Sequence, residues 1–333
     1  MKKVVFIIPY FGKLHNYFHL FLASCGKNPD IDFLFVSDLE FPDLPPNCSI
    51  LKLSFQELVN RINQKLGFIS SLKQIYKIVD FKPMYGDLFE KEIAPYDYWG
   101  FCDCDMILGN LKVFLESIDM AQYEKIFCHG HMTILKNNDK MRRLYQKQGN
   151  FRREGIFDFR EAFSTKCVVH FDEGGGFTAI CDYYDIQSYE EVTYADINFA
   201  QKPFMLAQPV PDAACPCIFK YEDGSLLRVM PQNTQKRVGG VFTKPYIYIH
   251  LQKRKMDVMI DKACDTYHIV PNAFIPKETI SEEVIHKYAK NVFYPCEVIR
   301  KLKHCVRRFS IARIKLTLRN KRLKRSLSHD QNH

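Results

Sequence analysis

Apolar runs alternate with amphipathic stretches in the first 66 residues. Residues 4–8, 31–36 and 50–53 are strongly apolar and predict buried strands. Between the first two strands, apolar side chains recur at helical spacing and predict a helix over residues 14–25. Ser54 and Glu57 form a capping-box pattern that predicts a helix from there to Leu66. Strand, helix, strand, strand and helix in this order favour an α/β sheet.

The rest of the chain predicts more elements of both kinds. We expect helices over residues 80–94 (interrupted by Pro83 and Gly86), 111–117 and, for the most part, 139–164. We expect strands over residues 98–102, 125–128, 167–171, 218–221, 226–230 and 246–251. Glu222-Asp223-Gly224-Ser225 lies between two of these strands and predicts a hairpin.

Composition narrows the class of protein. The chain has 333 residues, of which 47% are hydrophobic and 26% charged, and this excludes a disordered or low-complexity protein. No apolar run approaches the length of a membrane span, and the first run ends at Pro9, too short for a signal peptide. The 12 cysteines include no C-x-x-C pair, so we expect reduced thiols in a cytosolic protein.

The positive charge is concentrated at the C-terminus. Residues 290–333 contain 13 basic and two acidic residues, so the net charge there is +11. The remaining 34 basic and 36 acidic residues give residues 1–289 a net charge of −2. We therefore divide the chain into a domain at 1–289 and a basic extension at 290–333. One apolar stripe in the extension indicates an amphipathic helix on an anionic membrane. A helix docked on the domain and nucleic-acid binding are the alternatives, and the scarcity of aromatic residues disfavours nucleic acid.

The acid pair Asp103 and Asp105 directly follows the apolar strand predicted at 98–102. Ligand sites in open α/β sheets lie at the carboxyl ends of strands. Carboxylates there suit Mg²⁺ or Mn²⁺, which takes its other ligands from phosphates and water. A divalent cation also neutralises the charge that develops on a diphosphate leaving group. The motif thus points to a metal and nucleotide site, with a simple strand-end turn as the alternative.

Three segments in this order carry a resemblance to a known family. Residues 4–12, Phe101-Cys102-Asp103-Cys104-Asp105 and residues 248–254 resemble the GT-A class of nucleotide-sugar glycosyltransferases, and more narrowly bacterial enzymes of surface-polysaccharide synthesis (capsule or O-antigen). The resemblance implies a Rossmann-like mixed sheet flanked by helices. It implies that Asp103 and Asp105 bind the metal and the diphosphate of a UDP-sugar, with His250 as a further metal ligand.

Other residues gain candidate roles at the nucleotide. Tyr10 or Phe11 is placed to stack on the base, and Asp38 resembles an acid that contacts the base or ribose. Lys82 is a candidate cation for the diphosphate, and Lys253 and Arg254 are further candidates. Core packing for the aromatic rings and solvent exposure for the cations are the alternatives.

A second acid pair, Asp172 and Glu173, precedes three glycines that let a ligand approach the backbone. In inverting GT-A enzymes a carboxylate at this place deprotonates the acceptor hydroxyl, and Glu173 is our first candidate because it adjoins the glycines. In a retaining enzyme these acids would instead position the acceptor. A polar turn is the alternative, and Asp196 is a weaker candidate acid. For His129 and His131 we favour contact with substrate or a structural role over zinc, which wants four N/S ligands in a structural site.

The sequence therefore predicts a metal-dependent glycosyltransferase that uses Mn²⁺ or Mg²⁺. It would move a sugar from a UDP-sugar to a hydroxyl of a growing surface polysaccharide or lipid-linked oligosaccharide. We expect it in the cytoplasm, at the inner face of the bacterial membrane, without a nucleic-acid partner. A metal-dependent nucleotidyltransferase and a non-catalytic membrane or nucleic-acid binding protein are the alternatives. No nucleophile elbow, G-x-G-x-x-G or Walker A motif supports hydrolase, NAD-dependent or P-loop chemistry.

Overall fold

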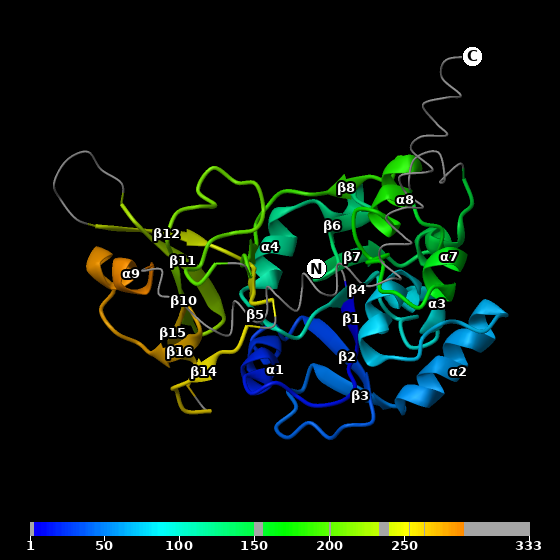
Figure 1. Cartoon of the computed structure of the whole chain (residues 1–333), viewed down its shortest axis with the longest axis horizontal. Helices are drawn as coiled ribbons and strands as arrows, with labels where there is room; N and C mark the ends of the chain where they lie inside the picture. The colour runs from blue at the N-terminus through cyan, green and yellow to red at the C-terminus, as the bar shows by residue number, and fades with distance from the viewer. Residues whose placement is uncertain are drawn as a thin grey trace, which may run out of the picture.

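The structure is a computed structural model that describes residues 3–149, 156–199, 201–232, 240–252, 254–262 and 264–289. It contains three β-sheets, with a seven-stranded sheet at one end and a six-stranded sheet at the other (Figure 1). The basic extension at 290–333 lies outside the described residues. None of the described helices has both the length and the apolar character that a membrane span needs.

The seven-stranded sheet has the order β3-β2-β1-β4-β7-β6-β8. Its strands are β1 (Val4–Pro9), β2 (Ile31–Ser37), β3 (Cys48–Lys52), β4 (Tyr98–Cys102), β6 (Lys125–His129), β7 (Met132–Lys136) and β8 (Ser188–Tyr189). Strand β1 runs parallel to β2 and β4, whereas β7 is antiparallel to β4 and β6. The predicted mixed sheet flanked by helices is confirmed.

Two helices cover opposite faces of this sheet. Alternate side chains of β1 point to opposite faces, so Val5 and Ile7 share a core with α2 (Phe55–Leu66), and Phe6 and Ile8 share one with α1 (Phe18–Gly26). The capping box is confirmed, because the Ser54 hydroxyl accepts a bond from the Glu57 amide and the Glu57 carboxylate accepts one from the Ser54 amide.

The helix predicted from residue 14 begins only at Phe18. The preceding side chains are committed elsewhere. His15 Nε2 donates to the carbonyl oxygen of Cys104 at 3.0 Å, and Asn16 Nδ2 donates to that of Met256 at 2.6 Å. The segment before α1 therefore forms a loop that connects two distant parts of the chain.

The region predicted as one interrupted helix over 80–94 is a ten-residue 3₁₀ helix, η1 (Ile75–Met84), followed by α3 (Tyr85–Leu88). The remaining helices are α4 (Leu111–Ser117), η2 (Met120–Gln122), α5 (Asp139–Arg143), η3 (Leu144–Gln146), α7 (Phe159–Ser164), α8 (Phe177–Tyr183) and α9 (Glu282–Ala289). The helix predicted over 139–164 is thus confirmed only in short pieces.

The predicted strand at 167–171 is wrong. These residues form no strand, and their backbone is held by a buried side chain instead. The Asp80 carboxylate accepts bonds from the amides of Val169 and Phe171, at 3.1 and 2.9 Å. Lys77 Nζ donates to Asp80 and to the carbonyl oxygen of Cys167, both at 2.6 Å. The ion pair of Lys77 and Asp80 on η1 therefore holds this segment through the hydrogen bonds that a neighbouring strand would otherwise supply.

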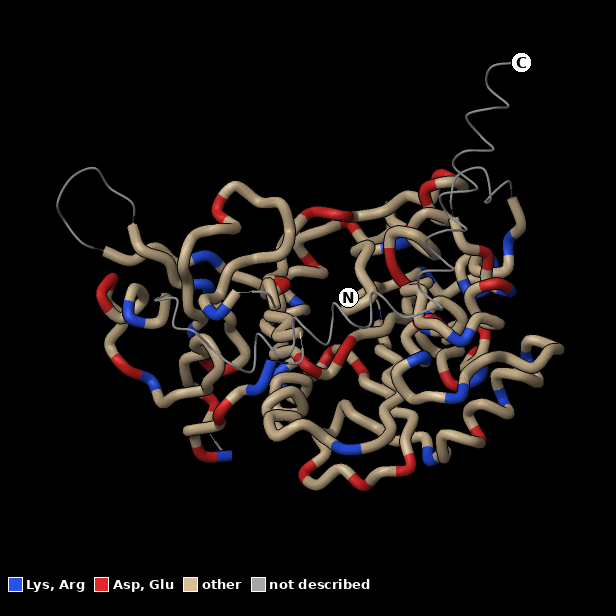
Figure 2. The backbone as a smooth tube through the Cα atoms, in the orientation of Figure 1, with Lys and Arg blue, Asp and Glu red and all other residues tan. Residues whose placement is uncertain are grey.

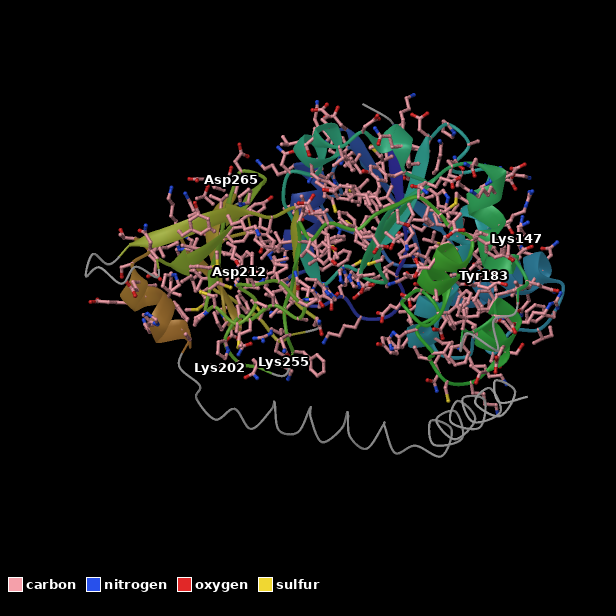
Figure 3. The ribbon with its side chains drawn as sticks, turned by 90° about the horizontal axis from the view of Figure 1, so that it is seen from above. Lys147, Tyr183, Lys202, Asp212, Lys255 and Asp265 are labelled. Carbon is pink, nitrogen blue, oxygen red and sulfur yellow. The ribbon has the colours of Figure 1, made fainter. Side chains whose placement is uncertain are left out.

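The six-stranded sheet has the order β12-β11-β10-β15-β16-β14. Its strands are β10 (Ile218–Glu222), β11 (Ser225–Pro231), β12 (Val241–Pro245), β14 (Asp257–Val258), β15 (Thr266–Val270) and β16 (Ala273–Pro276). The hairpin is confirmed, with Glu222 opposite Ser225 and positive φ at Asp223 and Gly224. Asp212 and Asp265 mark this end of the molecule, and Lys147 and Tyr183 mark the other (Figure 3).

A three-stranded sheet joins the two ends, with the order β5-β13-β9. Its strands are β5 (Met106–Leu108), β9 (Ala195–Asp196) and β13 (Tyr248–His250). Met106 and Tyr248 pack in the core beneath the seven-stranded sheet, whereas Ile107 and Ile249 pack in the core of the six-stranded sheet. The short strands therefore belong to both cores, and the residues at their ends lie at the junction.

Acidic and basic positions are interspersed along the described backbone and do not separate into two faces (Figure 2). This agrees with the nearly neutral charge of residues 1–289. Long-range electrostatic attraction is therefore not a property of the described body as a whole. Any charge that matters for chemistry there must be local.

Candidate functional site

The acid pair and His250 meet at the junction of the sheets. Asp103 and Asp105 lie in the connection from β4 to β5, and His250 ends β13. Strand β13 is antiparallel to β5, with His250 opposite Met106. The Leu251 amide donates to the carbonyl oxygen of Asp105 at 2.8 Å, so the two segments are fixed side by side. Residues 147 positions apart on the chain, from 103 to 250, thus share one site.

The side chains of Asp103, Asp105 and His250 converge on one point. His250 Nε2 lies 3.3 Å from Asp105 Oδ1 and 3.7 Å from Asp103 Oδ2, and the candidate ligand atoms all lie within 4.8 Å of one another. Adjacent ligands on an octahedral ion of Mg²⁺ size are about 3 Å apart. Two carboxylates and one imidazole suit Mn²⁺ or Mg²⁺ in chemical character. The residues therefore fit the predicted cation.

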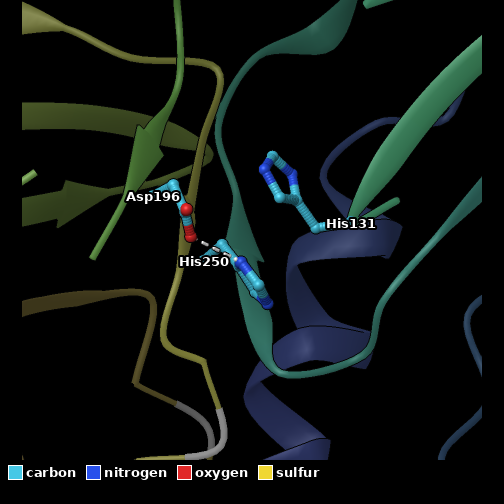
Figure 4. Close-up of side chains that lie close together, drawn as sticks. All are labelled: His131, Asp196 and His250. Atoms are coloured by element: carbon cyan, nitrogen blue, oxygen red, sulfur yellow. Dashed lines mark hydrogen bonds and ion pairs between the residues drawn. The ribbon is translucent and has the colours of Figure 1, made fainter. Parts of the chain in front are cut away.

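Asp196 fixes the orientation of the His250 ring. His250 Nδ1 lies 2.8 Å from Asp196 Oδ1 (Figure 4). This bond leaves Nε2 directed at Asp105, 3.3 Å away. Gln252 Nε2 donates to the same Asp196 oxygen at 2.7 Å. Burial would lower the pKa of His250, but Asp105 and Asp196 outweigh it and raise the pKa to about 10. Asp196, a weaker candidate acid in the sequence, thus supports the ring of His250.

His131 lies beside His250 as a neutral ring. Its centroid is 4.8 Å from that of His250, and its Nδ1 is 3.0 Å from the Tyr248 hydroxyl (Figure 4). Burial, together with the neighbouring His250 and His129, holds the pKa of His131 well below its usual range. His131, Asp196 and His250 also place ligand atoms within 4.8 Å of one another.

Lys82 is buried and lies among three oxygen acceptors. It is 6% exposed, and its Nζ donates to Asp103 Oδ1 and to the carbonyl oxygen of Gly130, both at 2.7 Å. Asp172 Oδ2 lies 3.4 Å from the same nitrogen. Burial would lower the pKa of Lys82, but Asp103 and Asp172 outweigh it and raise the pKa. An ammonium has three N–H donors, and three acceptors surround this one.

The second acid pair adjoins this cluster, but its two members differ. Asp172 is 3% exposed, and its Oδ1 has no hydrogen-bond partner among the described residues. Burial raises the pKa of Asp172 to about 7, with Lys82 opposing the shift. Glu173 is exposed and lies 3.7 Å from His170 Nδ1. A Cβ on Gly130 would lie 2.3 Å from Asp172 Oδ2 and 3.1 Å from Glu173 Cγ, so both acids flank that glycine.

The residues predicted at the base lie around the end of β1. Phe11 is buried and packs edge-on against Phe55, with ring centroids 5.5 Å apart, so it belongs to the core. Tyr10 is partly exposed and donates from its hydroxyl to the carbonyl oxygen of Lys13 at 3.1 Å. Asp38 is exposed after β2. No contact among the described residues joins it to Asp103, Asp105 or His250. Tyr10 is therefore the ring that this strand end presents.

Arg254 is a structural residue in this fold. It is 4% exposed, and its guanidinium donates to the carbonyl oxygens of Asn198 and Lys202 at 2.9 and 2.8 Å. It therefore holds the loop after β9 and does not face the acid pair as a free cation. Lys202 and Lys255 mark this edge of the molecule in Figure 3. Lys253, the other predicted phosphate contact, lies outside the described residues.

Sequence reasoning missed two supports of the site. The bond from His15 to the Cys104 carbonyl holds the acid-pair loop, and the Gly130 carbonyl is an acceptor for Lys82. The glycine between two histidines was a usable signal, because a residue without Cβ permits close approach of other groups. Nothing in the local sequence around His15 indicates its partner 89 positions away.

A family model matches residues 6–278, and the chain belongs to this family, which is described as a family of unknown function (DUF6625). No curated protein matches the chain. Among solved structures, the glycosyltransferase GlyE of Streptococcus pneumoniae TIGR4 matches with 11% identity and a TM-score of 0.29. That match covers 60% of this chain and 48% of GlyE, so it spans about half the length of GlyE.

The galactosyltransferase LgtC, solved with donor and acceptor sugar analogues, matches with 9% identity and a TM-score of 0.30. The match covers 59% of this chain and 75% of LgtC. Similarity of this extent does not define an activity.

Proposed function

We propose that this protein is a metal-dependent GT-A-type glycosyltransferase that uses a UDP-sugar donor. The observation that carries the proposal is the convergence of Asp103, Asp105 and His250 on one point, with a second acid pair beside them. Among the described residues, Asp103 and Asp172 both contact Lys82, and Asp105 and Asp196 both contact His250. Carboxylates gathered in this way favour a divalent cation and, through it, a diphosphate.

The residues divide the chemistry of glycosyl transfer between them. A cation held by Asp103, Asp105 and His250 would neutralise the charge that develops on the departing UDP. Glu173 would accept the proton of the acceptor hydroxyl. At the same time the hydroxyl oxygen would bond to the anomeric carbon of the donor sugar, and the bond from that carbon to the diphosphate would break. Glu173 suits this role better than Asp172 because it is exposed beside the open glycines. Tyr10 would stack on the base.

The experiment that tests this proposal is a thermal-shift panel with UDP, GDP, CDP and ADP, each with and without Mn²⁺. A ligand at 100 times its Kd stabilises the folded state by about 2.7 kcal/mol. We expect stabilisation by UDP that needs Mn²⁺ and is lost in Asp105→Ala. The matched control is Asp30→Ala, which removes an exposed acid paired with Lys112 at 3.0 Å and leaves the response intact. No response to any nucleotide would refute the proposal.

The acceptor and location are proposed on charge. The basic segment 290–333 would hold the enzyme on the anionic inner face of the bacterial membrane, where a lipid-linked saccharide or growing surface polysaccharide would be the acceptor. The full chain should sediment with vesicles that contain anionic lipid and not with neutral vesicles. Equal binding to both would contradict the electrostatic basis of this location.

A further inference from the structure

The three N–H donors of Lys82 are matched by three acceptors from three different segments. Asp103 follows β4, Gly130 joins β6 to β7, and Asp172 precedes α8. Lys82 is 6% exposed, so water does not replace these partners readily. A phosphate oxygen would have to displace one of them to reach Lys82. The role predicted from the sequence, a cation that faces the diphosphate, does not fit this arrangement.

Asp172 is held between Lys82 and Gly130. Its Oδ2 lies 3.4 Å from Lys82 Nζ, and it is so close to Gly130 that a Cβ there would be 2.3 Å away. Its Oδ1 is buried and has no hydrogen-bond partner in the described part of the chain. A buried charge with an unsatisfied oxygen depends strongly on its remaining partner. For Asp172, that partner is Lys82.

We infer that Lys82 and Asp172 are positioning residues that fix the metal ligand Asp103 relative to the loop that carries Glu173. The inference rests on the proposed function for the roles of Asp103 and Glu173. Lys82 donates a hydrogen bond to Asp103 Oδ1, whereas Asp103 Oδ2 is the oxygen that lies nearer His250. Asp172, which directly precedes Glu173, forms an ion pair with the same Lys82 nitrogen. The Lys82 ammonium thus links the metal ligand on the donor side to the loop of the proposed base on the acceptor side, and it contacts neither donor nor acceptor.

The test compares Lys82→Met, Asp172→Asn and the double variant in the full chain. We expect Lys82→Met to lower kcat for sugar transfer by about 100-fold, the cost of a small misplacement of reacting groups. At saturating Mn²⁺ the Kd for UDP should change less than about threefold, since no phosphate contact is lost. The melting temperature should fall in Lys82→Met and recover in the double variant, because Asp172→Asn removes the buried charge left without a partner.

Arg228→Met is the matched control, because Arg228 is a buried cation of the six-stranded sheet with one carboxylate and two carbonyl acceptors, those of Asp212 and Cys215. It should lower the melting temperature and leave kcat per folded molecule unchanged. The inference is overturned if Lys82→Met weakens UDP binding at saturating Mn²⁺ about tenfold or more, the loss expected for a charged phosphate contact. It is also overturned if Lys82→Met keeps full kcat, or if the double variant is no more stable than Lys82→Met.

These outcomes separate the inference from the proposed function. If the wild-type protein binds no nucleotide, the proposed function fails, and the recovery of stability in the double variant still reports whether Lys82 and Asp172 form a coupled pair. If the wild type binds UDP with Mn²⁺ and transfers sugar, but Lys82→Met does so equally well, only the positioning role fails. Should Lys82→Met not fold, Asp172→Asn and the double variant still supply kcat and Kd, and an unchanged kcat in both overturns the inference.

Discussion

Lys77 and Lys82 lie on the same 3₁₀ helix, both are buried, and each faces three acceptors, yet they stand in opposite electrostatic surroundings. Lys77 has one carboxylate partner, Asp80, and two carbonyl oxygens, those of Ala162 and Cys167. Lys82 has two carboxylates and one carbonyl oxygen. Lys77 therefore faces one carboxylate, whereas Lys82 faces two.

The pKa values of the two lysines reflect this difference. Burial lowers the pKa of Lys77, and Asp80 only partly opposes it. At Lys82, Asp103 and Asp172 outweigh the same effect of burial and raise the pKa. A balanced pair serves to hold a backbone segment, and Lys77 and Asp80 hold residues 167–171. Two buried carboxylates beside one ammonium have a cost that a proton or a bound cation relieves.

The largest effect we predict on the structural side is for Lys77→Met. Removal of one partner of a buried ion pair costs about 3–5 kcal/mol, because Asp80 stays behind as an uncompensated charge. Urea denaturation measures this loss. Lys140→Met is the control, since Lys140 pairs with Glu124 at 2.6 Å but is about half exposed, and such pairs contribute about 0–1 kcal/mol. Equal losses in the two variants would contradict the comparison.

The pH dependence of stability in Asp172→Asn tests the surroundings of Lys82, the second lysine of the comparison. Burial raises the pKa of Asp172 to about 7, supported by Glu173, Asp103 and Asp80 and opposed by Lys82. Between about pH 4 and 7 the folded protein therefore keeps a proton that the unfolded chain has released, so the free energy of unfolding falls as the pH rises. The asparagine variant lacks this contribution.

The measurement is the difference in unfolding free energy, variant minus wild type, from urea denaturation at several pH values. This difference should grow in favour of Asp172→Asn from pH 4 to pH 7 and stay constant above. Parallel pH profiles of the two proteins would show that Asp172 has an ordinary pKa and is better compensated than its surroundings indicate.

The smallest effect is expected for the glycines near the second acid pair. In Gly130→Ala the new methyl group would meet Asp172 Oδ2 at 2.3 Å, and the forced shift should cost about 1–3 kcal/mol. At Gly175 no atom lies within 4 Å of an added Cβ, so Gly175→Ala is the matched control and should be neutral. Thermal melting of both variants distinguishes them, and equal melting temperatures would argue against a tight contact between Gly130 and Asp172.

Local patterns predicted the elements whose stabilisation is local. The capping box at Ser54 and the hairpin at Asp223-Gly224 both appear as predicted, because each depends on residues a few positions apart. The strand predicted at 167–171 failed because an apolar run does not reveal that Asp80 binds its amides. The helix expected from residue 14 starts late for a similar reason, since His15 and Asn16 bind distant carbonyl groups.

The site was predictable in its residue types more than in its contacts. A strand followed by Asp103 and Asp105 predicted a cluster at the carboxyl end of β4, and the structure brings His250 beside both acids. The partners of Lys82 were not predictable, because an isolated lysine before Pro83 gives no sign of burial or of acids 21 and 90 positions further on. Asp196 was noticed as an acid, but its bond to His250 Nδ1 depends on how β9 pairs with β13.

The pairing of β5 with β13 also sets an order of events during synthesis. Strands β1 to β4 and helices α1 and α2 come from the first third of the chain, and their core can collapse while the ribosome is still translating the rest. The acid pair is made at the same early stage, but His250, the proposed third metal ligand, lies on β13, which must emerge before it can dock on β5. A nascent chain therefore carries Asp103 and Asp105 without His250 for roughly 7–30 s, because ribosomes add about 5–20 residues per second. The proposed cation site is complete only after most of the protein has been made, so the cation would be a late addition to this fold and not a nucleus for it.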